Sequence, residues 1–453
     1  MAGHYADVES QSWEAVQAEH CSLLKDQLAY LASESAYYRE RFAGWEVGPE
    51  DAETSEGFTA IPLTDKDDER LAQESSTRAE PLGPHQAAAR EDLNRVLSSS
   101  GTTGEPTFFG LTSADLDAWQ EMCARSSYAN GVRPDDVVIH ANSRTMVPGT
   151  LPYVLGLEAI GATVVPAGSE SSERILETVD RLDADVLFST VSHLQYLAER
   201  APAILNKEVS ELSVEKLIGG GEPGTADPEI RAALHDAWGA EVVTETMGIG
   251  DVSAAVAGEC REEDGMHLVC QGFVRVELLD PDSGERVPME ADAEGELVYT
   301  PLRREATPLL RFRSGDYARV VGTDCECGRT APRIQVLGRA DDMLIYKAQN
   351  VYPAAIREVV GTVEGASPRV TVVLPRADKV RFDESIPIEV VGDDTDQPAE
   401  TVAETIERAV RERLQVWVEP TIVDSDALER STYKTDLVRV REGSEANEGA
   451  RTR

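Results

Sequence analysis

Ser98-Ser99-Ser100-Gly101-Thr102-Thr103-Gly104-Glu105-Pro106-Thr107 places six hydroxyl side chains and two glycines in one short stretch. Hydroxyl groups and exposed backbone N–H groups donate hydrogen bonds to an anion, and glycine lets the main chain approach it closely. The apolar Phe108 and Phe109 follow at once, so we expect the chain to return to a strand there. A flexible serine/glycine linker is the alternative. The stretch therefore predicts an anion-binding loop that leads into a strand.

The loop is not a nucleotide P-loop of the ordinary kind, because Gly-x-x-x-x-Gly-Lys-Ser/Thr occurs nowhere in the chain. It resembles the signature loop of adenylate-forming enzymes, the superfamily of acyl-CoA synthetases, luciferases and peptide-synthetase adenylation domains, which ends in Thr-Thr-Gly-Lys-Pro. Glu105 stands where that superfamily has lysine. Its charge repels triphosphate unless a metal or an arginine compensates. The resemblance implies that ATP is bound by Ser99, Ser100, Thr102, Thr103 and Gly104.

The composition is strongly acidic, with 83 Asp and Glu against 43 Lys and Arg and a formal net charge of −40. Nucleic acid and anionic membranes would be repelled, so neither is expected as a partner. The acidic residues are spread along the whole chain, which fits a surface kept soluble in concentrated salt, where screening shortens repulsion to about 3 Å. We therefore expect a halophilic cytoplasm. Lysine is scarce, so each lysine is a candidate for a specific role.

The chain has no run of 18 apolar residues, and residues 1–10 are polar and acidic. These features predict a protein without a membrane span or secretion signal, located in the cytoplasm. Six cysteines are too few for a disulfide scaffold in 453 residues. Their spacing is therefore more informative than their number.

Strand and helix segments alternate between residues 113 and 219, which favours a parallel α/β core with crossover helices. From about 265 to 335, short strands separated by turns indicate antiparallel β structure. We predict an α/β protein whose large N-terminal domain, residues 1–339, has parallel α/β sheets and a small antiparallel β subdomain. A small α+β C-terminal domain should follow over residues 340–453, with residues 442–453 disordered.

Residues 10–45 are predicted to form a helix that ends in Tyr38-Arg39-Glu40-Arg41-Phe42. Ile61-Pro62-Leu63-Thr64-Asp65-Lys66 comes next, and Thr64 or Asp65 is suited to cap a short helix. The two features resemble the N-terminal region of phenylacetate-CoA ligases, a family of adenylate-forming enzymes. That family has a helix ending in Tyr-Arg-x-x-Phe and then a Leu-Pro-x-Thr-Lys segment.

Two glycine-rich motifs are expected at the carboxyl end of the parallel sheet, where ligands bind. Gly219-Gly220-Gly221-Glu222-Pro223-Gly224 follows a predicted strand and resembles the segment that phenylacetate-CoA ligases place against adenine. Met247-Gly248-Ile249-Gly250-Asp251 takes the place of the superfamily's Tyr-Gly-x-Thr-Glu motif, whose acidic residue holds Mg²⁺. The resemblance implies that Gly221, Glu222, Pro223, Met247 and Gly248 bind nucleotide and that Asp251 is catalytic through magnesium. Simple turns are the alternative for both motifs, and Gly250 lacks the usual hydroxyl.

Arg311-Phe312-Arg313-Ser314-Gly315-Asp316 resembles the motif whose aspartate accepts both ribose hydroxyls. Gly338-Arg339-Ala340-Asp341-Asp342 resembles the junction between the two domains. The resemblance implies that Asp316 and Arg339 bind nucleotide and that Asp341 is the hinge. Lys434, in Ser431-Thr432-Tyr433-Lys434, takes the place of the catalytic lysine that reaches the α-phosphate. An ordinary surface lysine is the alternative.

Cys260, His267, Cys325 and Cys327 together supply three thiols and one imidazole, a set that suits tetrahedral Zn²⁺. Phenylacetate-CoA ligase relatives share the Cys-x-Cys-Gly-Arg-Thr run, and some hold a structural zinc there. A set of three buried free thiols and a surface histidine is the alternative. Because no coordination position is left open, such an ion would stabilise folding and would not perform the chemistry.

The resemblance to phenylacetate-CoA ligases spans roughly residues 12–440. It implies an AMP-forming acid–CoA ligase that uses ATP and Mg²⁺, activates an aromatic, phenylacetate-like carboxylic acid as an acyl-adenylate and transfers it to CoA. The pocket wall differs at residues 142–149, where Arg144 could meet a second anionic group. Three alternatives stay open. The enzyme could activate another acid, it could use another acceptor such as a deazaflavin coenzyme, or the chain could be a degenerate nucleotide-binding member without ligase activity. A homodimer is left open.

Overall fold

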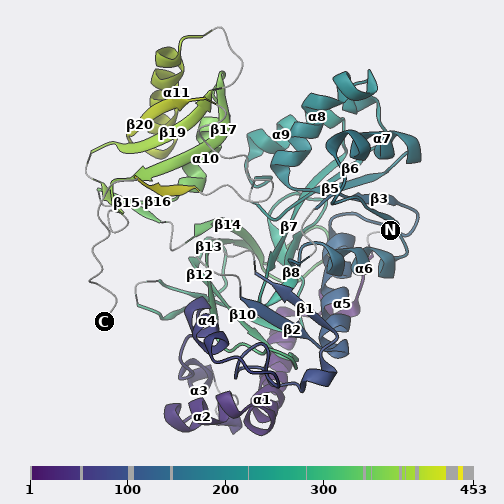
Figure 1. Ribbon diagram of the computed structural model, residues 1–453, viewed down its shortest axis with the longest axis vertical. Helices are drawn as coiled ribbons and strands as arrows, with labels where there is room; N and C mark the ends of the chain where they lie inside the picture. Colours follow the sequence, from purple (N-terminus) through teal and green to yellow (C-terminus); the bar gives the residue numbers. More distant parts are fainter. Residues whose placement is uncertain are drawn as a thin grey trace. The chain divides into compact units, whose positions relative to one another are not determined.

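The computed structural model describes residues 3–50, 55–99, 107–142, 146–222, 224–281, 283–339, 343–347, 349–376, 380–382, 384–392, 397–424 and 437–441. The chain divides into two compact units, Met1–Val336 and Leu337–Arg453 (Figure 1). None of the helices in these described ranges is both long and apolar enough to span a membrane.

The helices of the first unit cover its sheet and its N-terminal end. They are α1 (Trp13–Glu34), α2 (Ala36–Trp45), α3 (Ser55–Thr59), α4 (Lys66–Glu74), α5 (Ser113–Ala129), α6 (Leu151–Ile160), α7 (Ser172–Leu182), α8 (Val191–Leu205) and α9 (Pro228–Trp238). The helix predicted over residues 10–45 is in fact two helices. Ser35 has extended backbone, and its hydroxyl accepts a hydrogen bond from the Tyr38 N–H, which starts α2.

The parallel strands of the first unit are β3 (Val137–His140), β4 (Thr163–Pro166), β5 (Val186–Ser189), β6 (Lys216–Gly220) and β7 (Val242–Ile249). They continue into the antiparallel strands β8 (Ser253–Glu259), β9 (Met266–Leu268), β10 (Val274–Leu279), β11 (Arg286–Val287), β12 (Glu294–Pro301), β13 (Phe312–Gly322) and β14 (Arg333–Arg339). All belong to one sheet with the order β11-β10-β12-β13-β14-β9-β8-β7-β6-β5-β3-β4. The antiparallel part is thus continuous with the parallel part through the β7–β8 pair.

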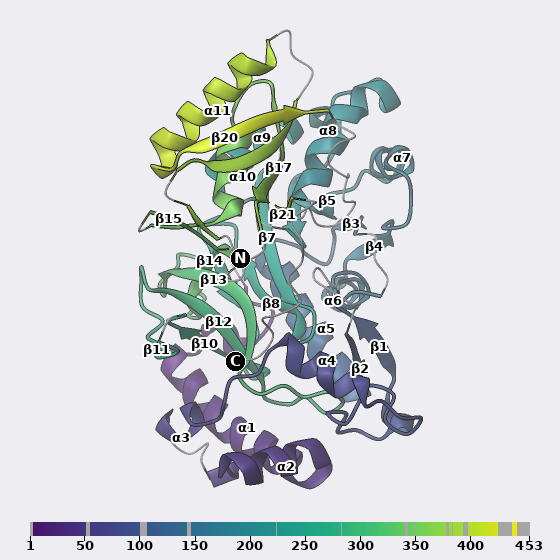
Figure 2. The same cartoon turned by 60° about the vertical axis from the view of Figure 1, so that its left-hand side comes forward.

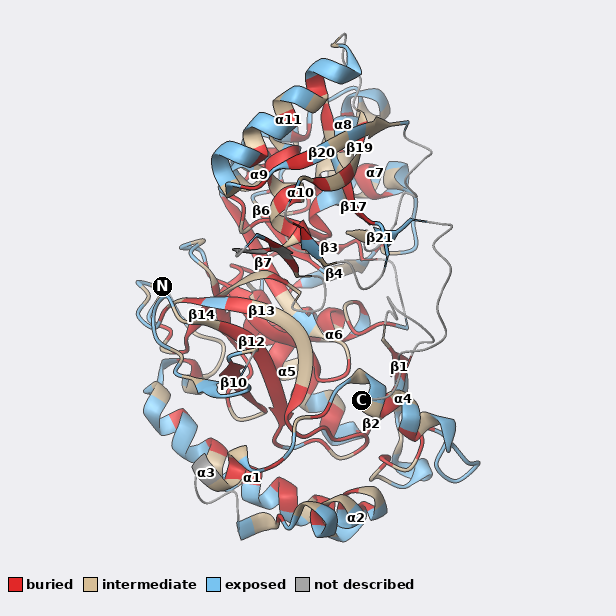
Figure 3. Cartoon of the chain, turned by 90° about the vertical axis from the view of Figure 1, so that its left-hand side faces the viewer, coloured by how far each residue is buried: buried red, intermediate tan, exposed pale blue. Residues whose placement is uncertain are grey.

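The inner parallel strands β3, β5 and β6 are buried on both faces, because helices cover each side, whereas the edge strand β4 is partly exposed. Val186 and Phe188 of β5 pack with residues of α5 and α6, whereas Leu187 packs with residues of α7, α8 and α9. Strands that are buried on both faces read as continuous apolar runs in the sequence, as β3 and β5 do. Figure 3 shows that α1 and α2 keep exposed outer faces.

Two further strands, β1 (Arg95–Ser98) and β2 (Phe108–Leu111), form an antiparallel hairpin of their own (Figure 2). Ser98 pairs with Phe108, so residues 99–107 connect the two strands. The predicted return to a strand at Phe108 is therefore confirmed.

The second unit has its own core of apolar side chains. It contains β15 (Leu344–Tyr346), β16 (Gln349–Val351), α10 (Pro353–Gly361), β17 (Ala366–Leu374), β18 (Arg381–Phe382), β19 (Ile386–Gly392), α11 (Ala399–Leu414), β20 (Val418–Val423) and β21 (Val438–Val440). The strands form a four-stranded sheet, β20-β19-β17-β21, and a three-stranded sheet, β16-β15-β18. The predicted disorder of residues 442–453 lies outside the described residues.

Candidate active site

The two ends of the serine- and threonine-rich loop are held together. The Ser99 N–H donates to the Thr107 carbonyl oxygen at 2.9 Å, and the two hydroxyl oxygens lie 3.0 Å apart. The loop therefore starts and ends on a fixed base at the connected end of the β1–β2 hairpin. Four predicted ATP-binding residues lie outside the described residues, namely Ser100, Thr102, Thr103 and Gly104.

The motif at residues 247–251 lies against this base. The Thr107 hydroxyl donates to Asp251 Oδ1 at 3.3 Å, and a Cβ added to Gly250 would lie 3.9 Å from Ser99 Cα. Close packing requires glycine at position 248, because a Cβ there would come within 1.9 Å of the Ala254 carbonyl oxygen. The structure thus brings together Ser99 and Asp251, two predicted site residues from distant parts of the sequence.

Lys66 was not among the predicted site residues, yet it lies at the centre of this region. Its ammonium nitrogen is 2.5 Å from Asp251 Oδ1 and 3.2 Å from Glu69 Oε2. We call Lys66, Glu69 and Asp251 the lysine–carboxylate cluster. The scarcity of lysine in the chain was the sequence signal that could have identified Lys66.

Helix α4 presents Lys66 to Asp251 because both of its ends are anchored. Asp65 caps its N-terminus by accepting hydrogen bonds from the Asp67 and Asp68 N–H groups, which confirms the predicted cap. Near its C-terminus, the Gln73 side chain donates to the Phe108 carbonyl oxygen at 2.7 Å and accepts from the Phe108 N–H at 2.9 Å. The helix is therefore fastened to β2, and both views show it beside the hairpin (Figures 1 and 2).

Burial and a neighbouring charge shift the pKa of one carboxyl group in the lysine–carboxylate cluster. Glu69 is only 4% exposed, and burial, together with the negative charge of Asp251, raises its pKa to about 8. The ammonium group of Lys66 opposes this rise. At neutral pH the Glu69 carboxyl is therefore largely protonated, although it lies beside the Lys66 ammonium group.

The adenine-binding segment predicted from the sequence follows β6, beside the end of β7. Gly220 pairs in parallel with Thr246, so Gly221 and Glu222 leave the sheet next to Met247. Gly221 has φ +89°, a backbone conformation that favours glycine. Glu222 Oε1 accepts a hydrogen bond of 2.6 Å from the Ser192 N–H at the start of α8. Pro223 lies outside the described residues.

Asp316 lies in a β-bulge. Glu296 pairs with Tyr317 and Val298 with Arg313, so extra residues of β13 face the single residue Leu297. Gly315 has φ +79°, and the Asp316 N–H donates to the Ser314 hydroxyl at 3.2 Å. Bulges redirect side chains and are frequent beside active sites.

Arg339 ends β14, the strand next to β13 in the sheet. The nucleotide-binding roles of Asp316 and Arg339 stay predictions. Asp341 and Lys434 lie outside the described residues.

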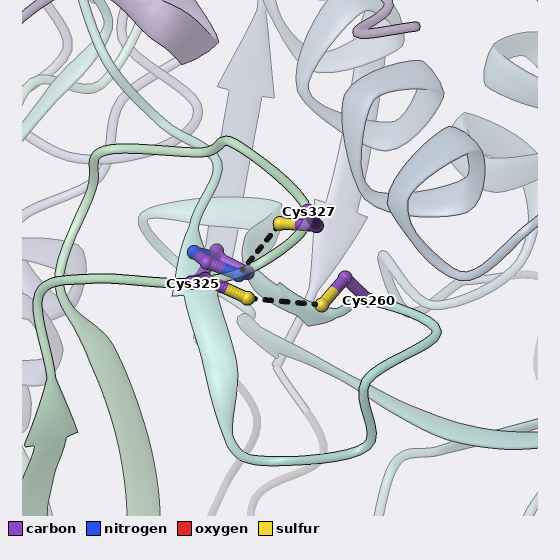
Figure 4. A group of neighbouring side chains, drawn as sticks. Cys260, Cys325 and Cys327 are labelled. Carbon is purple, nitrogen blue, oxygen red and sulfur yellow. Dashed lines mark hydrogen bonds between the residues drawn. The ribbon is translucent and has the colours of Figure 1, made fainter. Parts of the chain in front are cut away.

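The predicted thiol–imidazole cluster is brought together by three neighbouring parts of the sheet. Cys260 follows β8, His267 lies on β9, and Cys325 and Cys327 lie on the connection between β13 and β14 (Figure 4). Their ligand atoms all lie within 4.8 Å of one another. Cys260 and Cys325 sulfurs are 3.6 Å apart, too far for a disulfide bond of about 2.05 Å.

The spacing of the cluster fits one tetrahedral zinc ion. Two sulfurs at about 2.3 Å from a tetrahedral ion would lie about 3.8 Å apart, close to the 3.6 Å between Cys260 and Cys325. Cys327 Sγ and His267 Nε2 are 3.4 Å apart. His267 Nδ1 lies 3.3 Å from the Ala331 carbonyl oxygen, an outer contact that leaves Nε2 facing the thiols.

Two family models match the chain. Residues 44–300 match the model described as AMP-binding enzyme, and residues 348–441 match its C-terminal domain. The chain belongs to the AMP-binding enzyme family. This membership confirms the predicted family, and the mixed α/β first unit with its smaller second unit confirms the predicted fold class.

Relatives of this AMP-binding enzyme are similar over most of its length. A phenylacetate-coenzyme A ligase of Thermus thermophilus is 33% identical, and the match covers 94% of this chain and 96% of the relative. A phenylacetate-coenzyme A ligase of Escherichia coli is 31% identical over 80% of this chain and 79% of its own. The crystal structure of 2-hydroxyisobutyryl-CoA ligase in the postadenylation state is 25% identical with a TM-score of 0.86, covering 96% of this chain and 91% of the other.

Proposed function

We propose that this AMP-binding enzyme is an AMP-forming acid–CoA ligase that activates an aromatic carboxylic acid. Similarity to two phenylacetate-coenzyme A ligases along nearly the whole chain supports the reaction class. The observation that carries the proposal is the convergence of the loop base, Asp251 and Lys66. Hydroxyl groups, one carboxylate and one cation at a single place are the groups that a metal-bound triphosphate needs.

In the first step, a carboxylate oxygen of the acid attacks the α-phosphorus of ATP, and the bond from that phosphorus to pyrophosphate breaks. Asp251 and Thr107 offer the hard oxygen donors that Mg²⁺ prefers, so they are the residues that would hold the ion. When bound, the ion supplies positive charge to the leaving pyrophosphate. Lys66 would release Asp251 to the ion and neutralise phosphate charge, which offsets the repulsion expected from Glu105.

In the second step, the CoA thiol attacks the acyl carbon, its proton leaves, and AMP departs with the bonding electron pair. The two steps need different groups at one acyl carbon. Rotation of the C-terminal domain about Asp341 would withdraw Lys434 after adenylation and admit the thiol. Adenylation makes the attack of the thiol favourable, because AMP is a better leaving group than the oxygen of a free carboxylate.

The thiol–imidazole cluster is proposed to hold a structural Zn²⁺. Its four ligands would complete a tetrahedral site without an open position, so the ion would join β8, β9 and the β13–β14 connection and take no part in the reaction. The thiol–imidazole cluster is therefore kept apart from the residues proposed to carry the reaction.

Acid-dependent exchange of pyrophosphate into ATP tests the proposal directly. The full chain would be assayed in molar KCl, because a net charge of −40 requires screening, with a panel of aryl and alkyl carboxylic acids. We expect exchange that depends on an aryl acid, and a CoA thioester when CoA is added. Exchange without thioester formation would indicate another acceptor.

Substitution of Lys434 should distinguish adenylate formation from thioester formation. Lys434→Ala should abolish adenylate formation, because the cation expected at the α-phosphate is lost, while thioester formation from supplied acyl-adenylate stays nearly intact. Both steps are measured on the same preparation by exchange and by thioester release. Equal loss of both steps would refute the role.

A nucleotide-binding protein without ligase activity is the second candidate. Glu105 in the loop and Gly250 beside Ser99 favour it, since each departs from the family pattern. Such a protein would retain affinity for ATP in calorimetry and show no exchange with any acid.

A further inference from the structure

His140 is a fully buried histidine at the carboxyl end of β3. Its ring packs edge-on against Phe188, with centroids 4.8 Å apart, and lies 6.4 Å from the ring of Tyr153. These neighbours come from β5 and α6, so His140 points to the face of the sheet that α5 and α6 cover. Aromatic rings thus surround an imidazole that none of the proposed steps uses.

The acceptors of this site lack donors within the described part of the chain. Backbone carbonyls of His140 and Gly149 lie near the ring, but no described group donates a hydrogen bond to a ring nitrogen of His140 or to Oδ1 of Asn142. Burial lowers the pKa of His140 to about 4, and the backbone carbonyls of His140 and Gly149 oppose this lowering only in part. The imidazole is therefore neutral at pH 7. A buried acceptor without a donor destabilises the protein, and a ligand that supplied the missing hydrogen bond would recover that free energy.

The position of His140 connects it to the nucleotide site. The Tyr153 hydroxyl lies 2.6 Å from Thr246 Oγ1, and Thr246 precedes Met247 on β7. A Cβ added to Gly250 would lie 3.9 Å from Pro148 Cγ, so residues 148–149 run between Gly250 and the carbonyl near His140. A Cβ added to Gly149 would meet no atom within 4 Å, so open space adjoins this segment.

We propose that the acid activated by this enzyme carries a hydroxyl group on its aromatic ring, and that His140 and Asn142 accept the hydrogen bond of that hydroxyl. A neutral imidazole has one N–H and one bare nitrogen. The nearby backbone carbonyls suit the N–H, which leaves the bare nitrogen, like Asn142 Oδ1, in need of a donor. Phe188 and Tyr153 would pack against the ring. The inference rests on the proposed function, since it names the substrate class of the same site.

Matched acids test this inference on the unmodified enzyme. Benzoate, phenylacetate and cinnamate would each be compared with their ring-hydroxylated isomers and with methyl isomers of similar size in the exchange assay. We expect at least one hydroxylated isomer to exceed both its parent and its methyl analogue about tenfold or more in kcat/KM, because a site with unpaired polar groups rejects analogues that lack the donor. Parent acids that match or exceed every hydroxylated isomer would overturn the inference.

Variants assign the preference to His140. In His140→Phe the ratio of hydroxylated to parent acid should fall to about one, whereas His140→Gln, which keeps an acceptor, should retain part of it. His235→Phe is the matched control, because both ring nitrogens of His235 are already hydrogen-bonded, to Ala240 and Glu263, and the ratio should not change. An unchanged ratio in His140→Phe would contradict the assignment. The comparison of acids on the unmodified enzyme stays decisive if His140→Phe does not fold, and a complete lack of exchange would refute the proposed function instead.

Discussion

The thiol–imidazole cluster and the lysine–carboxylate cluster both join distant segments, but they differ in completeness. Cys260 and Cys325 are 65 positions apart, and Lys66 and Asp251 are 185 apart. The four thiol and imidazole groups would complete a tetrahedral metal site with no position left. The lysine–carboxylate cluster instead holds a buried carboxyl whose pKa is raised and a point cation beside the base of the serine- and threonine-rich loop. A complete ligand set indicates a structural role, whereas incompletely balanced charge indicates a ligand.

The largest effect is expected from Asp251, the proposed ligand of Mg²⁺. Asp251→Asn should lower acid-dependent exchange by about 10²–10³-fold, because the amide cannot supply the same charge to the metal–phosphate group. Asp264→Asn is the control, since its exposed carboxylate pairs with Arg333 and contacts none of the proposed site residues among those that the structure describes. If Asp251→Asn kept more than about a tenth of the activity, the role would be wrong.

Lys66 should have the next largest effect. Lys66→Met should raise KM for ATP about 10–100-fold, because it removes the cation that would face the phosphates and keeps the length of the side chain. Lys207→Met provides the control, because Lys207 is exposed and pairs with Asp180. An unchanged KM for ATP, measured in the exchange assay, would leave Lys66 with a purely structural role.

Substitution of Cys325 should lower the stability of the fold and leave the reaction rate nearly unchanged. Cys325→Ser should purify without zinc and melt several degrees lower, since a structural ion contributes folding free energy, while kcat of the folded enzyme changes by less than about threefold. Metal content and thermal melting are the measurements. Cys21→Ser should keep its metal, because Cys21 lies outside the cluster. Full metal content and unchanged melting in Cys325→Ser would remove the zinc proposal.

Glu69 should give the smallest effect, seen only as a dependence on pH. Its pKa is raised from 4.5 to about 8 in the folded chain, so the folded state keeps a proton that the unfolded state releases. This contribution to stability is present below about pH 4.5 and is lost as pH rises through about 8. Glu69→Gln mimics the protonated form, so its melting temperature should rise relative to the unmodified protein over that interval. The exposed Glu404→Gln should show no such trend.

The local sequence pattern was sufficient to predict features that are formed by adjacent residues. The loop at Ser98–Thr107, the cap at Asp65 and the alternation of strands and helices were all predicted. The cluster of Cys260, His267, Cys325 and Cys327 could also be recognised, because these residue types have few other uses together.

Lys66 and His140 could not be placed from the sequence. Lys66 reaches Asp251 only because Gln73 fastens α4 to β2, and a lysine alone gives no sign of its partner. His140 is one polar residue in an apolar strand, and its missing hydrogen bonds become visible only when Phe188 and Tyr153 surround it. Both facts concern partners that lie far away in the chain.

The sequence by itself thus determined the family, the α/β architecture and the residue types available for phosphate, metal and thiol ligands. The tertiary structure alone decided which of them face one another, which carboxyl has its pKa raised, and which polar atoms are left without partners. The physical reason is that propensity and periodicity act over a few residues, whereas burial and charge pairing depend on segments that only folding brings together.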